Sequence, residues 1–137
     1  MFGTRSHSRV MAKLPDADSL PRRELVAMEA LVTPVEIPAG RVLMEEGSPG
    51  NEAMLILEGE VVVERSGEAV AVLGPGSVVG EAALLANQPR NATVTAASDV
   101  LAAAMSRREF ATILDRCPVM AQRILTTAVS RAGASLQ

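Results

Sequence analysis

The sequence predicts one mainly β domain with flanking helices, arranged as a sandwich or a barrel-like roll. Short apolar stretches recur through the middle of the chain, and turns containing glycine and proline separate them. Apolar residues at helical spacing occur on both sides of this region. The length of 137 residues suits a single domain and leaves no room for a second full core.

Near its N-terminus, the chain divides into a tail and a helix. We expect residues 1–18 to be a flexible tail and residues 19–137 to form the domain. Pro21 suits the first position of a helix, and apolar residues follow it at helical spacing. These apolar residues are Leu25, Met28 and Leu31. The helix should end at Thr33, because the residue before a proline avoids helical geometry.

Seven or eight short strands are expected in the middle of the chain. They lie at residues 35–37, 41–45, 54–57, 60–64, 69–73, 78–79, 91–96 and 100–105. Turns such as Gly74-Pro75-Gly76 mark the breaks between them. The stretch from Glu81 to Ala86 differs from its surroundings, because it consists of good helix formers but is too short for a full helix.

Two helices are expected at the C-terminal end. Ser106 and Glu109 have the spacing of a capping box, in which each side chain bonds to the backbone amide of the other residue. A helix should run from there to about Arg116, and Pro118 suits the start of another. The last helix has one apolar face, which consists of Ala121, Ile124, Leu125, Ala128 and Ala132.

Composition and charge argue against several classes of protein. Hydrophobic residues make up 48% and charged residues 21% of the chain, which is typical of a folded globular domain. The net charge is −3 and the basic residues are scattered, so we expect no DNA binding by this chain alone. The two basic pairs, Arg22-Arg23 and Arg107-Arg108, are interpreted as solvated residues at helix starts.

The apolar stretches, the single cysteine and the single histidine bear on where the protein is located and on whether it is an enzyme. No stretch approaches the roughly 18 apolar residues of a membrane span, and the polar N-terminus does not resemble a signal peptide. The single cysteine, Cys117, cannot form an internal disulfide, so we expect it to pack in the core of a cytoplasmic protein. The single histidine, His7, lies in the expected tail. We therefore expect no catalytic residue, no metal site and no cofactor.

Residues 80–94, with the sequence GEAALLANQPRNATV, carry the candidate site. A short helix that follows a glycine presents unpaired amides at its start, and such a start suits an anion. The small side chains of Ala82 and Ala83 leave room for it. Arg90 offers a planar fork suited to a phosphate, and Glu81 offers an acceptor suited to a ribose hydroxyl. On these grounds alone, an ordinary helical turn with a simple Glu81–Arg90 ion pair is an alternative.

Two motifs in this stretch resemble the phosphate-binding cassette of cyclic nucleotide-binding domains: Gly80-Glu81-x-Ala83-Leu84 and Pro89-Arg90-x-Ala92-Thr93-Val94. Their spacing resembles that in regulatory subunits of cAMP-dependent protein kinase, and the family includes bacterial cAMP receptor proteins. The resemblance extends from about Leu20 to Arg131. It implies an eight-stranded antiparallel β-roll, similar to a jelly roll, with an N-terminal helix, a short cassette helix and two C-terminal helices.

The resemblance also implies a role for each residue of the site. Glu81 would bind the ribose 2′-hydroxyl, and Arg90 would pair with the cyclic phosphate. The amides of Ala83 and Asn91 would donate to the phosphate or ribose region. The expected ligand-binding residues are Gly80, Glu81, Ala82, Ala83, Arg90, Asn91 and Ala92. The last helix, from Pro118, would form a mobile lid near the base.

Three positions depart from the family pattern. Val79 stands where the family often has phenylalanine. Asn91 stands where alanine often accompanies cAMP preference and threonine accompanies cGMP preference. No aromatic residue follows Phe110, so a cap over the base would have to be aliphatic, such as Leu136.

The expected function is that of a stand-alone cyclic-nucleotide-binding regulatory or sensor module, not an enzyme. We expect the ligand to be cAMP, with cGMP as the other candidate. Only six residues follow Arg131, so no helix-turn-helix is expected, and the output would pass to an unidentified effector protein or to self-association. The alternative is a nucleotide-silent member of the same fold that serves as a protein-interaction scaffold.

Overall fold

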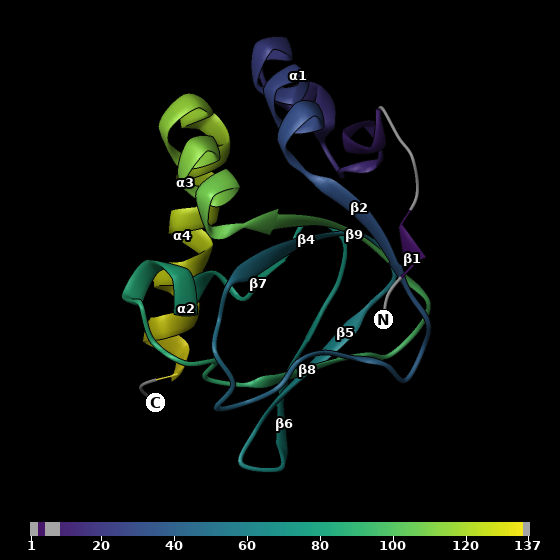
Figure 1. The fold of residues 1–137 in the computed structure, drawn as a ribbon, viewed down its shortest axis with the longest axis vertical. Helices are drawn as coiled ribbons and strands as arrows, with labels where there is room; N and C mark the ends of the chain where they lie inside the picture. The colour runs from purple at the N-terminus through teal and green to yellow at the C-terminus, as the bar shows by residue number, and fades with distance from the viewer. Residues whose placement is uncertain (1–2, 5–8, 136–137) are drawn as a thin grey trace.

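The computed structural model of the chain describes residues 3–4 and 9–135. It contains two antiparallel sheets that form a roll, with helices outside it (Figure 1). The first sheet has the strand order β1-β2-β9-β4-β7, and the second has the order β3-β8-β5-β6. The strands are β1 (Gly3–Thr4), β2 (Thr33–Ile37), β3 (Val42–Met44), β4 (Glu52–Glu58), β5 (Val61–Arg65), β6 (Glu68–Leu73), β7 (Val78–Val79), β8 (Thr93–Ala96) and β9 (Val100–Ser106). The eight strands β2 to β9 confirm the expected roll.

The helices gather mainly on one side of the roll. They are α1 (Arg22–Leu31), α2 (Glu81–Ala86), α3 (Arg107–Arg116) and α4 (Pro118–Ser135). Figure 1 shows α2, α3 and α4 along one side and α1 at the top. The capping box at the start of α3 is confirmed, because the Glu109 amide donates to Ser106 Oγ at 3.1 Å and the Ser106 amide donates to Glu109 Oε1 at 2.8 Å. No helix in the described part of the chain is long and apolar enough to span a bilayer.

Strand β4 lies between two apolar cores. Each residue from Ala53 to Leu57 is buried, because alternate side chains of a strand point to opposite faces of its sheet. Met54 and Ile56 face the interior of the roll, where the buried apolar residues of the described chain come from the strands and from Ala92. Leu55 faces the second core, between the sheet and the helices. The unbroken apolar run in the sequence therefore reflects burial on both faces.

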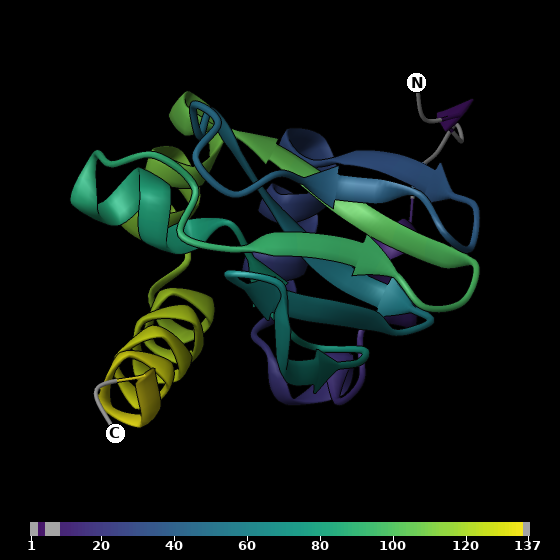
Figure 2. The ribbon, with the colours of Figure 1, turned by 90° about the horizontal axis from the view of Figure 1, so that it is seen from below.

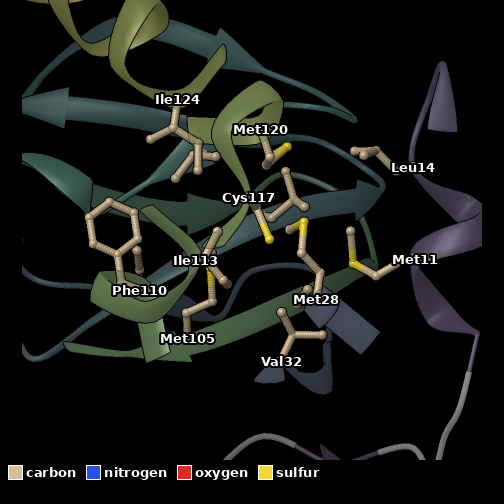
Figure 3. Packing of buried hydrophobic residues seen from close by; sticks show 14 of the residues in the cluster. Met11, Leu14, Met28, Val32, Met105, Phe110, Ile113, Cys117, Met120 and Ile124 are labelled. Atoms are coloured by element: carbon tan, nitrogen blue, oxygen red, sulfur yellow. The ribbon is translucent and has the colours of Figure 1, made fainter. Parts of the chain in front are cut away.

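Methionine and cysteine fill much of the core on the helix side. Figure 3 shows Met28, Met105, Cys117 and Met120 pointing toward one another from α1, β9 and the α3–α4 junction. The sequence contains only two aromatic residues, so the flexible thioether side chains of methionine fill space that aromatic rings occupy in the cores of many other proteins. This core connects α1 to the beginning of α4. Cys117 is fully buried, as expected.

The segment before α1 differs from the expected flexible tail. Two short 3-10 helices, η1 (Val10–Lys13) and η2 (Ala17–Ser19), lie within it. Three of its apolar side chains, Val10, Met11 and Leu14, are buried in the helix-side core. Their spacing is that of one helical face, a signal that the polar surroundings obscure. Strand β1 also pairs with β2. The rest of the expected tail, including His7, lies outside the described residues, so the boundary at residue 19 stays a prediction.

Helix α4 departs from its expected apolar face. Ala121 and Ile124 are buried as predicted, but Leu125 is 42% exposed. Figure 2 shows the reason, because α4 leaves the body of the domain along its length. The side chains of Ala128 and Ala132 lie outside the described part of the helix. Among the described side chains of α4, the buried ones therefore lie in its first two turns.

Candidate functional site

Residues 80–94, called the cassette below, leave the first sheet at β7 and enter the second at β8. Gly80 turns the chain into α2 with a φ of +85°, a conformation that favours glycine. A side chain at this position would also collide with Arg90 Nη1 and Met44 Cε, each 2.6 Å from an added Cβ. Asn87 ends the helix with a φ of 53°, and its amide donates to the Ala83 carbonyl. The tight turns at Gly80 and Asn87 limit α2 to six residues.

Arg90 returns from the end of the cassette to its beginning. Its guanidinium donates from Nη1 to the Gly80 carbonyl at 3.1 Å and from Nη2 to the Glu52 carbonyl at 2.7 Å. The residue is only 8% exposed. A guanidinium has five N–H donors, so these two bonds hold the fork in place and leave donors for an anion. Arg90 therefore lies beside the start of the cassette.

The charge environment of Arg90 suits a bound anion. Burial lowers the pKa of the guanidinium, the nearby Glu52 carboxylate raises it, and the Arg107 cation lowers it again. Arginine nevertheless stays protonated in proteins. A buried cation that is partly desolvated and lies near a second cation is stabilised by a negative ligand.

The loop at residues 47–50, which precedes β4, contacts both Arg90 and the helix α2 of the cassette. The Arg90 amide donates to the Ser48 carbonyl at 2.9 Å, and the Gly47 amide donates to the Arg90 carbonyl at 2.9 Å. Gly50 packs directly on α2, because an added Cβ would lie 2.4 Å from the Cβ of Ala83. Residues 47–50 therefore hold both the arginine and the short helix.

The other predicted site residues divide by burial. Glu81 is 4% exposed and makes an interaction within the structure. Ala83 and Ala92 are buried, Gly80 and Ala82 are half-buried, and Asn91 is exposed. The neighbouring side chains of the roll interior are apolar, and they include Met44, Val79 and Val94. The cassette therefore places a cation and a carboxylate at one end of an apolar interior. That arrangement suits a small ligand with one anionic group, hydroxyls and an apolar ring.

Comparison with known proteins shows the family to which the fold and the cassette belong. The family model of the cyclic nucleotide-binding domain matches residues 34–117, which include the whole cassette. The chain belongs to the cyclic nucleotide-binding domain family. A cyclic nucleotide-gated potassium channel of Rhizobium etli is 32% identical over 125 residues, which is 91% of this chain and 35% of the channel. The chain thus spans about a third of the length of that relative.

Two solved structures extend the likeness to three dimensions. The catabolite activator protein of Thermus thermophilus is 26% identical, with a TM-score of 0.73 over 85% of this chain and 57% of that one. An engineered regulatory subunit of a cAMP-independent protein kinase A from Trypanosoma brucei, bound to cAMP in its A site, is 28% identical. Its TM-score is 0.71 over 84% of this chain and 44% of that one. Both likenesses support the fold described above.

Sequence reasoning missed the role of Arg107 in this cyclic nucleotide-binding domain. Arg107 is exposed, as expected of a solvated residue. It also donates from α3 to the Leu84 carbonyl at 3.3 Å and to the Gly50 carbonyl at 2.9 Å, which the sequence did not predict. It thereby ties α3 to both the cassette helix and the loop beneath it. Its partners are backbone carbonyls 23 and 57 residues away, so no local pattern marks it. Glu52 was also missed, because its contribution to the site is a carbonyl and a nearby charge.

Replacing Arg107 with glutamine should loosen the cassette. Each of its two hydrogen bonds is worth roughly 0.5–1.5 kcal/mol, so we expect the loss of both to lower cyclic nucleotide affinity about fivefold to 150-fold. Titration calorimetry measures the change, and Arg108→Gln on the exposed side of the same helix is the matched control. Equal affinities for the two variants would show that Arg107 does not support the cassette.

No group of three or more histidine, cysteine, aspartate or glutamate residues that could hold a metal occurs among the residues placed by the structure. The polar groups that the structure does bring together are those of the cassette.

Proposed function

We propose that this chain is a regulatory module that binds cAMP through residues 80–94 and passes the signal to a partner protein. The observation that carries the proposal is the buried Arg90 guanidinium, held by the carbonyls of Gly80 and Glu52 at the end of the apolar roll interior. A cation held in this way needs an anionic partner, and a cyclic phosphate has the charge and the acceptors that a planar fork binds.

The remaining groups suit the rest of such a nucleotide. The carboxylate of Glu81 lies in the first turn of α2 and is an acceptor for a ribose hydroxyl. The amides of Ala83 and Asn91 would donate to the phosphate or ribose. Apolar residues of the roll, such as Val94, offer a surface for the base. The proposal involves binding and no chemical step, so none of these residues has a catalytic role.

Similarity to a solved structure favours cAMP, and the side chain of Asn91 makes cGMP the second candidate. The trypanosomal structure with 28% identity holds cAMP, which supports the same ligand here. Asn91 is exposed, and its amide group can both donate and accept. It therefore suits the amino group of guanine as well, and cGMP is the second candidate.

Output through a protein partner is supported by the way the cassette connects to the helices. Arg107 joins α2 to α3, and α3 is followed directly by α4. A change in the cassette would therefore reach α4, whose later turns extend from the body of the domain (Figure 2). We propose an effector protein or a second copy as the receiver, in a cytoplasmic setting and without DNA binding by this chain. The signal would be an equilibrium between two positions of α4. The nucleotide can shift this equilibrium only if it binds one of the two states more tightly than the other.

Titration calorimetry with cAMP and then cGMP tests the function directly. We expect saturable one-to-one binding, with cAMP bound more tightly. Glu81→Ala should weaken binding while leaving measurable affinity, because the phosphate contacts to Arg90 persist. The absence of heat and of thermal stabilisation with either nucleotide, up to millimolar concentration, would reject the sensor and favour the nucleotide-silent scaffold. Unchanged affinity in Glu81→Ala would reject the ribose role.

A further inference from the structure

Glu24 is a fully buried carboxylate that lies outside the cassette. It belongs to the first turn of α1 and is 0% exposed. Its Oε2 accepts from the Val119 amide at 3.0 Å, and its Oε1 accepts from the Met120 amide at 2.9 Å. Both donors lie in the first turn of α4. Burying a carboxylate without hydrogen bonds costs free energy. The two amides of α4 offset this cost for Glu24, and they do so only when α1 and α4 are packed as they are here.

Two amides in the first turn of α4 donate to an acceptor on another helix. Pro118 has no amide hydrogen, and the Ala121 amide already donates to the Cys117 carbonyl at 2.7 Å. The amides of Val119 and Met120 are then the ones that need an acceptor. Glu24 supplies one oxygen to each, and its negative charge is favourable at a helix N-terminus. A residue 95 positions away thus provides the cap.

Burial along α4 changes sharply after two turns. Cys117, Met120 and Ile124 are at most 3% exposed and point into the core on the helix side (Figure 3). Leu125 is 42% exposed, and the next two residues, Thr126 and Thr127, are also exposed. We call residues 117–124 the root of α4. The root is held by packing and by Glu24, whereas the described side chains that follow it, at residues 125–127, are exposed.

We propose that Glu24 is a positioning residue that anchors the root of α4 to α1, so that ligand-dependent movement of α4 begins beyond Ile124. The movement rests on the proposed nucleotide-binding function, but the anchor does not. With the root fixed, α1, α3 and the first turns of α4 form one unit, and the later turns of α4 are the part that presents the signal. Removal of the Glu24 carboxylate would release the root and shift the pivot back toward Pro118.

The single cysteine of the chain provides a direct probe of the anchor. Cys117 is fully buried at the α3–α4 junction, and its Sγ lies 3.9 Å from the Glu24 carbonyl oxygen. Burial raises the pKa of the Cys117 thiol, and the Glu24 charge raises it further. Reaction with Ellman's reagent should therefore be slow in the native protein and should accelerate when the root opens.

We would compare the wild type with Glu24→Ala, Glu24→Gln and the control Glu29→Gln without nucleotide. Glu29 is a matched control because it lies on the same helix and accepts from the Met11 amide at 3.0 Å. We expect Glu24→Ala to label at least tenfold faster, Glu24→Gln to be intermediate and Glu29→Gln to stay within twofold of the wild type. Amide exchange at Val119 should accelerate in the same order. Labelling and exchange in Glu24→Ala equal to those of the wild type would overturn the anchor.

The second arm locates the pivot by amide exchange with and without saturating cAMP. In the wild type, we expect cAMP to change exchange beyond Ile124 and to leave Cys117 labelling within twofold. In Glu24→Ala, the cAMP-dependent change should extend into the root. A change of equal size on both sides of Ile124 in the wild type would reject the pivot. If calorimetry shows no nucleotide binding, the proposed function fails, while the nucleotide-free comparison still decides the anchor.

Discussion

Replacing Arg90 with alanine is expected to weaken cyclic nucleotide binding by about 2–5 kcal/mol, which corresponds to a loss of roughly 30-fold to several thousandfold in affinity. The loss is large because the phosphate would keep its charge in a site whose cation has been removed. The variant also loses the bonds to the carbonyls of Gly80 and Glu52, so the start of the cassette is no longer held.

Calorimetry and thermal unfolding separate these two effects. Arg90→Lys keeps the charge but not the planar fork, and we expect it to recover only part of the affinity. The free energy of unfolding of each variant without nucleotide shows how much of the loss comes from the fold. Wild-type affinity in Arg90→Ala, in a protein whose wild type binds cAMP, would remove Arg90 from the phosphate site.

Replacing Gly50 with alanine should destabilise the domain and weaken binding at the same time. The added Cβ would lie 2.4 Å from the Cβ of Ala83 and 3.3 Å from Nη1 of Arg90. Two carbon atoms cannot approach so closely, so α2 or the loop must move. Overpacking of this kind typically costs about 1–3 kcal/mol, and here the displaced element is the cassette helix. We expect urea unfolding to show the loss of stability and calorimetry to show weaker cAMP binding.

A second substitution tests the steric cause. In the double variant Gly50→Ala with Ala83→Gly, the colliding Cβ is absent, and we expect part of the stability and affinity to return despite the poorer helix propensity of glycine. Gly74→Ala is the matched control, because its added Cβ meets nothing closer than 4.0 Å. Strictly additive effects in the double variant would show that the contact between residues 50 and 83 is not the cause.

Local patterns in the sequence predicted most of the architecture. The capping box at Ser106 and Glu109, the glycine entry to α2 at Gly80 and the apolar run of β4 each depend on neighbours within a few residues. Such features have strong local preferences, so their positions could be predicted without a structure. The antiparallel roll, and the joint role of Glu81 and Arg90 at one ligand site, followed from the resemblance to a family as well as from the residues.

Other features could not be predicted, because their causes lie far away in the chain. Leu125 belongs to an apolar periodicity, yet it is exposed where α4 leaves the body of the domain. Arg107 has the composition of a solvated residue, yet its donors reach carbonyls of two other segments. Glu24 lies in a helical pattern where a charge predicts solvent exposure, yet it is buried against α4.

The sequence by itself determined the order of the elements from α1 to α4, the positions of the tight turns and the residue types of the cassette. These depend on backbone preferences and on spacing along the chain, which the residues carry with them. The tertiary structure alone decided which carbonyls orient Arg90, which loop supports α2 and which carboxylate caps α4. Each of these is a pairing between segments that only the packed domain brings within hydrogen-bonding distance, and burial gives the pairing its strength.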